Sequence, residues 1–208
     1  MQLQSRHQCL IYEGSPSRQL PALAALIQQK LDENYRCLYL NSPIMVAGMR
    51  TALEAVGVDV AQEAAKTSLV LSSEAAVSPN GIFDTDVMMH KLDDAIDQAL
   101  KDGHKGLFAT GDMTWEFGSK ESFSKLLAYE WRLEQLFHKR PELSGICQYH
   151  SDTLPREAVR QGLVSHQRIF INETLSCMND YYAESEQRAG KAAASPEIDK
   201  AVTDILKN

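Results

Sequence analysis

The sequence predicts an α/β protein, a three-layer α/β/α domain built on a mostly parallel, doubly wound sheet. Short apolar runs alternate along the chain with segments that carry apolar residues at helical spacing. The apolar runs are nearly continuous, which is typical of strands buried on both faces. Hydrophobic residues make up 44% of the 208 positions, which is enough for one full core.

Six apolar runs are predicted to be strands. They comprise residues 8–12, 36–40, 67–73, 106–112, 144–150 and 168–172. Each run is short and mostly apolar, as expected for a strand that crosses a core. The run at 168–172 is the last one that the pattern supports as a strand.

Five helices are predicted between these strands. The first should begin near Ser17, because apolar residues then recur at positions i, i+3, i+4, i+7 and i+11. The others are expected from Ser42 to Gly57, from Asp84 to Gly103, over residues 121–139, and from Pro155 to about Leu163. Asp84 is a favourable N-cap, and glycine commonly ends a helix. Residues 78–84 should form a turn, since Pro, Asn and Gly occur together there.

The chain changes character after about residue 176. Residues 176–208 are charged and Ala-rich, with a Ser-Pro break. We therefore divide the chain into a domain over residues 1–175 and a charged helical C-terminal tail over residues 176–208. We expect the tail to be loosely attached, so that residues 1–175 fold without it, and to serve as a partner-binding arm or a contact in a homo-oligomer.

Composition and charge exclude several classes of partner. The net charge is −7 and the isoelectric point is near 5.4, which disfavours direct binding to nucleic acid or to an anionic membrane surface. No apolar stretch reaches the roughly 18 residues that a membrane span needs, and no cleavable signal pattern is present. The four cysteines are widely spread, and three of them lie in or beside apolar runs, as reduced core thiols do in cytosolic proteins. We expect a soluble, cytoplasmic protein.

The loop after the first strand, in the segment "LIYEGSPSRQL" (10–20), has the layout of a phosphate-binding loop. A functional P-loop needs a second glycine followed by Lys and Ser or Thr, which hold phosphate and Mg²⁺. The residues found in this loop are Gly14, Ser15, Ser17 and Arg18. No second glycine follows, and no lysine with a Ser or Thr directly after it is present in the segment. We therefore expect a tight turn without nucleotide chemistry, no cofactor, and no enzymatic activity.

A ligand pocket is expected at the carboxyl ends of the central strands, where doubly wound sheets bind their ligands. Its predicted border consists of Glu13, Asp112, Trp115, Cys147, Tyr149 and His166. Trp115 would supply an apolar wall, while Asp112 and His166 would orient a small molecule by hydrogen bonds. The alternative is a purely structural role for these residues, with Trp115 and Cys147 in the core and Asp112 capping a turn.

Metal binding is not predicted. His7 and Cys9 should share one face of a strand, whereas Cys147 and His150, three residues apart, should face opposite ways. A zinc site needs three or four convergent ligands, and the sequence shows no tight cluster of them.

Eight motifs in a fixed order resemble a known family. They are "HQCLIYEG", "RCLYLNSP", "ALEAVGVDV", "GIFDTDVMMHKL", "GLFATGDMTW", "LLAYEWRLEQLF", "GICQYH" and "LVSHQRIFIN". Together they are similar to the MEDS domain, the sensory domain of methanogen and methylotroph regulators, including the dichloromethane-responsive repressor. The resemblance covers roughly residues 6–173, with "GDMTW" at its centre.

The resemblance implies a fold like that of RecA- and KaiC-type ATPases with a degenerate P-loop, and a role in sensing simple hydrocarbon derivatives. It also places Cys147 and His166 at positions suspected of ligand contact. The repressor's helix-turn-helix has no room before residue 6, so we expect signalling through a partner, either a histidine kinase or a transcription regulator.

Three functions remain open at this stage. The first is a sensory domain that binds a small hydrocarbon-derived ligand and signals through a partner protein. The second is a KaiC-like nucleotide-binding ATPase that tolerates a poor P-loop. The third is a protein-interaction scaffold without a small ligand.

Overall fold

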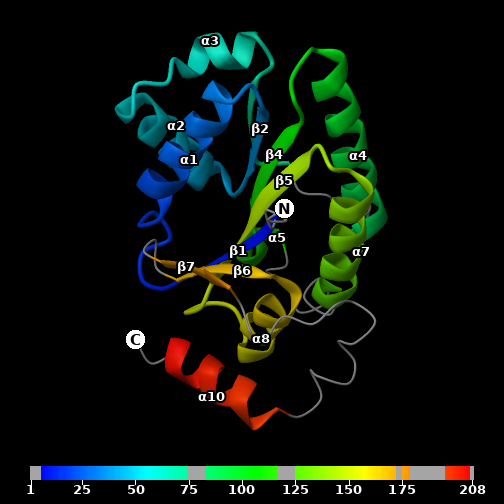
Figure 1. Cartoon of the computed structure of the whole chain (residues 1–208). Coiled ribbons are helices and arrows are strands. Elements are labelled where there is room, and N and C mark those ends of the chain that lie inside the picture. Colours follow the sequence, from blue (N-terminus) through cyan, green and yellow to red (C-terminus); the bar gives the residue numbers. More distant parts are fainter. Residues whose placement is uncertain (1–5, 75–82, 117–124, 172–174, 179–194, 207–208) are drawn as a thin grey trace.

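The computed structural model describes residues 6–74, 83–116, 125–171, 175–178 and 195–206, with the backbone alone for 115–116 and 175–178. These residues form one seven-stranded sheet with helices on both faces (Figure 1). The strands are β1 (His7–Tyr12), β2 (Arg36–Leu40), β3 (Leu69–Ser72), β4 (Leu107–Asp112), β5 (Leu143–His150), β6 (Arg168–Ile171) and β7 (Leu175–Met178). The predicted three-layer α/β/α architecture is confirmed.

The strand order is β3-β2-β4-β5-β1-β6-β7. Every neighbouring pair is parallel except β6 and β7, which run antiparallel. Along the central pair, His7 lies opposite Gly145 and Cys9 lies opposite Cys147. This register sets which side chains of β1 and β5 meet on each face of the sheet.

One face of the sheet is covered by α1 (Leu20–Asp32), α2 (Pro43–Ala55) and α3 (Val60–Ala65). The apolar stripe of α1 predicted from the sequence is buried there, together with Met49 and Leu53 of α2. Ser42 caps α2 by accepting a hydrogen bond from the backbone N–H of Met45. These helices enclose the smaller of the two apolar cores.

The other face is covered by α4 (Thr85–Lys101), α7 (Leu126–Lys139), α8 (Arg156–Ser165) and α10 (Pro196–Ile205). Asp84 caps α4 as predicted, accepting hydrogen bonds from the N–H groups of Asp86 and Val87. The short helix α5 (Met113–Glu116) follows β4 directly. Cys147 of this larger core belongs to the polar cluster described below, and the other members of that cluster are buried as well.

The six predicted strands are all present, with bounds that shift by at most two residues. The first helix begins at Leu20 instead of Ser17, because residues 15–19 form turns first. Two short helices, α3 and α5, are not predicted by the pattern, since each is too short to show a period. Most of the predicted turn at 78–84 and the start of the predicted helix at 121–139 lie outside the described residues.

The C-terminal segment contributes to both the sheet and the main core. The expected boundary after residue 175 falls inside β7, a strand that the apolar pattern misses. Further on, α10 packs against α8 and buries Ile198 and Val202 in the main core. The carboxylate of Asp199 pairs with the Arg160 guanidinium of α8. Residues 176–208 therefore contribute both a strand and a core helix.

Within the part of the chain that the structure describes, no helix is both long enough and apolar enough to span a bilayer.

Candidate functional site

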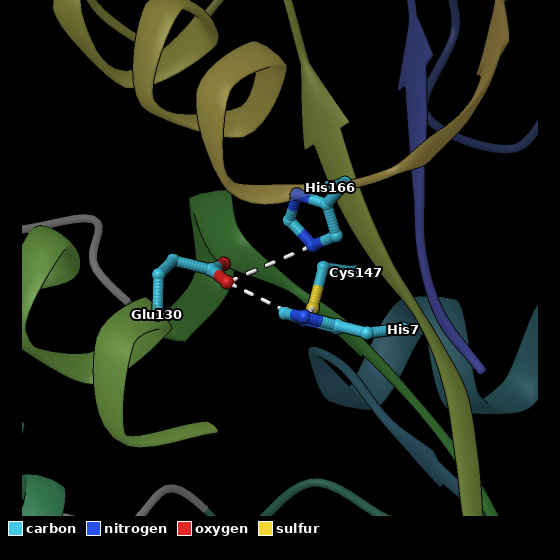
Figure 2. A group of neighbouring side chains, drawn as sticks. All are labelled: His7, Glu130, Cys147 and His166. Atoms are coloured by element: carbon cyan, nitrogen blue, oxygen red, sulfur yellow. Dashed lines mark hydrogen bonds and ion pairs between the residues drawn. The ribbon is translucent and has the colours of Figure 1, made fainter. Parts of the chain in front are cut away.

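Four side chains with metal-binding and acid–base chemistry meet between the sheet and the helices α7 and α8. His7 comes from β1, Glu130 from α7, Cys147 from β5, and His166 from the residue that ends α8 (Figure 2). One ligand atom from each residue lies within 4.8 Å of the others. We call these four residues the buried quartet.

The distances within the buried quartet are short and similar. Glu130 Oε2 lies 3.5 Å from His7 Nε2 and 3.6 Å from His166 Nε2. The Cys147 sulfur lies 3.6 Å from the same His7 nitrogen. All four side chains are buried, and Glu130 and His166 are completely shielded from solvent. A carboxylate in such a place is costly unless hydrogen bonds or opposite charge compensate it.

Local contacts hold the two imidazoles in place. His166 Nδ1 lies 2.9 Å from the carbonyl oxygen of Gly162, so this nitrogen carries the proton and donates it. The Nε2 atom of His166 therefore faces Glu130. The His7 ring stacks on Phe137 at 4.4 Å between centroids, and the two imidazoles are 4.1 Å apart. Each ring is oriented by groups outside the quartet.

Tyr149 supports the quartet from β5. Its hydroxyl donates a hydrogen bond to Glu130 Oε1, the oxygen that does not face the histidines. Burial, followed by the nearby Glu130 carboxylate, raises the pKa of Tyr149 well above its usual range. The same two causes raise the pKa of the Cys9 thiol, which lies on the same face. Tyr149 is therefore a permanent hydrogen-bond donor to the carboxylate.

An apolar cavity of about 30 Å³ adjoins the quartet. Its walls include Met88, Leu92, Met113 and Tyr129, and Cys147 and Phe137 belong both to it and to the surroundings of the quartet. Gly145 also lines it, and a Cβ at this position would lie 2.3 Å from the backbone oxygen of Ala109. A water-sized sphere needs roughly 10–15 Å³, so the cavity holds a molecule of about two or three heavy atoms.

A larger groove of about 190 Å³ lies between α4 and strands β2 and β3. It shares Leu40, Met88 and Leu92 with the inner cavity. The groove is lined at its outer part by Lys91 and Glu74 and becomes apolar toward the shared residues. The two spaces are thus separated by the same three side chains.

Gly14, in the loop after β1, has both its backbone N–H and its carbonyl hydrogen-bonded within the protein. The backbone N–H of Gly14 donates to the Asp152 carboxylate at 2.7 Å, and His150 Nε2 donates to the Gly14 carbonyl at 2.8 Å. The chain continues from β1 to β2 and from β5 to β6, and β2 and β6 lie on opposite sides of the β5–β1 pair. The two connections therefore leave this end of the sheet in opposite directions. The crevice in which doubly wound sheets bind ligands is therefore spanned by contacts between the chain's own loops.

Asp112 lies on the opposite face of the sheet from the quartet. Its Oδ2 accepts a hydrogen bond of 2.7 Å from the hydroxyl of Tyr12, and both side chains are buried. Burial, followed by the Asp112 carboxylate, raises the pKa of Tyr12. Because side chains alternate along a strand, Asp112 shares the face of Phe108, which packs in the core under α1 and α2.

The structure divides the six residues of the predicted pocket. It brings Cys147, Tyr149 and His166 together in and beside the quartet, while Asp112 lies on the other face. Glu13 is partly exposed in the loop after β1, and the side chain of Trp115 lies outside what the structure describes. His166 also precedes β6 and so lies at an amino end, not at the carboxyl edge that we expected.

Two members of the quartet were missed from the sequence. His7 was noted only for sharing a strand face with Cys9, which the structure bears out. Glu130 carried a signal that could have been used. It lies within the apolar stripe of α7, between Leu126 and Leu133. A glutamate is rarely buried at such a position unless a buried partner compensates its charge. The opposite facing of Cys147 and His150 is as predicted.

Fold and site together define a three-layer α/β protein with a buried polar cluster on one face of its mostly parallel sheet. The chain belongs to the MEDS family, the methanogen/methylotroph, DcmR sensory domain, whose family profile matches residues 6–167. MEDS is a family of sensory domains, so the chain has a sensory role. No curated protein matches the sequence significantly.

Proposed function

We propose that the protein is a cytoplasmic sensor that binds a small, mostly apolar molecule in the cavity beside Cys147 and passes its bound state to a partner protein. The observation that carries the proposal is the contact of this apolar cavity with the buried quartet through Cys147. The cavity walls would select for small size and low polarity, and the thiol would supply a specific contact.

The size of the cavity supports a ligand of the simplest hydrocarbon-derived kind. A volume of about 30 Å³ suits a molecule such as a one-carbon halide or alcohol. The groove beside α4 offers a route inward, because Met88 and Leu92 line both spaces and methionine side chains adapt readily. Cys9, Cys37 and Cys147 are buried and form no disulfide, which agrees with a reducing compartment.

Helix α8 supports a path from the cavity to a partner. His166 ends this helix, and Arg156 and Arg160 near its start bind α10 through Asp199. A ligand that shifts Cys147 or His166 would therefore act on the helix that holds the C-terminal segment. We propose that a histidine kinase or a transcription regulator reads that change at α10.

Nucleotide binding has less support. The Gly14 N–H, which would face a phosphate in a P-loop, donates to Asp152. The segment from Gly14 to Leu20 also lacks the lysine, directly followed by Ser or Thr, that phosphate and Mg²⁺ require. A scaffold without a ligand is the remaining alternative, and the experiment below separates it from a sensor.

Methionine methyl signals in nuclear magnetic resonance would test the sensor proposal. Met88 and Met113 line the cavity, whereas Met49 is fully buried in the core on the other face and serves as the internal control. Titration with dichloromethane and separately with methanol should shift the Met88 and Met113 signals in a saturable way. The Ala109→Val variant, which narrows the cavity, should weaken that response.

Equal shifts of Met49 would contradict the proposed site. No saturable shift with either probe would contradict the proposed ligand class and favour the scaffold.

A further inference from the structure

We propose that the buried quartet binds one zinc ion, with His7 Nε2, Glu130 Oε2, Cys147 Sγ and His166 Nε2 as the four ligands. The inference goes beyond small-molecule sensing and does not depend on it. It rests on the spacing of the ligand atoms, the balance of charge, and the contacts that hold each ligand in position.

The spacing fits a common tetrahedral ion. Two ligand atoms at about 2.0–2.3 Å from one zinc ion and at a tetrahedral angle lie roughly 3.3–3.6 Å from each other. The distances from Glu130 Oε2 to the two imidazole nitrogens are 3.5 and 3.6 Å, and the Cys147 sulfur is 3.6 Å from His7 Nε2. These separations exceed those of ordinary N–H···O hydrogen bonds. These three separations match edges of a tetrahedron of ligands, and the other three lie within 4.8 Å.

The charges balance in the same way. A thiolate at Cys147 and a carboxylate at Glu130 carry two negative charges, and two neutral imidazoles add none. One Zn²⁺ ion makes the whole centre neutral, which matters because all four side chains are buried in an apolar core. Nitrogen and sulfur ligands with one carboxylate suit zinc better than magnesium or calcium, which prefer oxygen alone.

The surrounding contacts are those that a metal ligand needs. The His166 Nδ1–H donates to the Gly162 carbonyl, which leaves Nε2 with its lone pair toward the centre of the quartet. Tyr149 holds the distal oxygen of Glu130, and Phe137 packs against the face of the His7 ring. Ligand orientation is therefore set by residues outside the site before any ion binds.

The four ligands come from elements that only the folded chain brings together. β1, α7, β5 and the end of α8 each supply one (Figure 2). A bound ion would therefore join the sheet to α7 and to the end of α8. Since Cys147 also lines the apolar cavity, a molecule bound there would lie next to the zinc-bound sulfur.

The test is the metal content of the full chain, purified without chelator and freed of any affinity tag. Elemental analysis should find one zinc per chain in the wild type. His166→Ala and Cys147→Ser should lose it. His150→Ala and Cys9→Ala are matched controls, because each removes a buried side chain of the same kind outside the quartet, and both should retain the zinc.

Cobalt substitution gives a second readout that does not depend on purification history. Metal-free protein titrated with Co²⁺ should show the visible bands of a tetrahedral ion and a thiolate-to-cobalt charge-transfer band, each saturating at one ion per chain. Cys147→Ser should lose the charge-transfer band. Circular dichroism of each variant establishes that it is folded before its metal content is compared.

The proposal is overturned if the wild type contains no zinc and its metal-free form gives no charge-transfer band with cobalt. Loss of zinc in His150→Ala equal to that in His166→Ala would also overturn it, and one ion of another metal per chain would overturn the assignment to zinc. Zinc at this site without any methionine shift by small molecules would leave the metal proposal standing and reject the sensor ligand alone.

Discussion

Tyr149 donates its hydroxyl hydrogen bond to Glu130, and neither side chain has any contact with solvent. The tyrosine belongs to the central strand β5 and the glutamate to the middle of α7, so the bond joins the sheet to the helix layer inside the core. A buried carboxylate needs hydrogen-bond donors from the protein, because it is no longer hydrated by water.

Tyr149→Phe should lower the free energy of unfolding by about 1–3 kcal/mol, since it removes a donor from a buried charged group. Urea denaturation measures this change. Tyr35→Phe is the control, because Tyr35 is only half-buried and lies beneath the Lys30 ammonium. That variant should change stability by no more than about 0.5 kcal/mol. Equal effects of the two substitutions would show that the Tyr149 hydroxyl contributes nothing specific.

The protein should not turn over ATP. The Asp112 carboxylate accepts a hydrogen bond from Tyr12, and the Gly14 N–H donates to Asp152. Phosphate release in the presence of Mg²⁺ should therefore stay at background for the wild type. Asp112→Asn should give the same background. ATP turnover by the wild type that disappears in Asp112→Asn would instead support the function of a nucleotide-binding ATPase.

Helix α10 should contribute to the stability of the whole domain. Ile198 is buried in the main core, so Ile198→Ala should cost about 2–5 kcal/mol, as deletions of buried aliphatic groups do. Ile44→Ala is the control, because Ile44 is 83% exposed on α2. Thermal or urea unfolding measures both. If a chain truncated after residue 175 unfolds with wild-type stability, residues 176–208 are a loosely attached tail and do not stabilise the domain.

Stability should fall at alkaline pH because of Cys37. The pKa of this thiol is raised in the folded chain, mainly because the thiol is buried. The folded chain therefore keeps the thiol proton, whereas the unfolded chain releases it at about pH 8.5. A raised folded pKa means that this contribution is complete below pH ~8.5 and is lost as the pH rises above it.

Urea unfolding from about pH 7 to about pH 10 measures the effect of Cys37. This thiol should account for a loss of about 1.4 kcal/mol per pH unit above the unfolded pKa. Cys37→Ala should show a shallower decline by that amount. An unchanged slope in the variant would mean that Cys37 ionises equally in both states.

The sequence alone determined the layers of the fold. The strand predicted at 36–40 has the bounds of β2, and Asp84 caps α4 as its position indicated. These features are local, because a buried strand or an amphipathic helix shows its burial in neighbouring residues. The lack of a Gly-Lys-Ser/Thr run after β1 can likewise be read from the sequence, since those residues are consecutive in a P-loop.

Only the tertiary structure decided where the site lies. The six-residue pocket was placed at one sheet edge by a general rule, but alternation along β4 turns Asp112 to the other face. His7 and Cys147 meet because β1 and β5 pair with His7 opposite Gly145. Glu130 and His166 join them only when α7 and α8 pack on that face. Residues so far apart in the chain leave no shared local pattern, so strand order and register assemble the quartet.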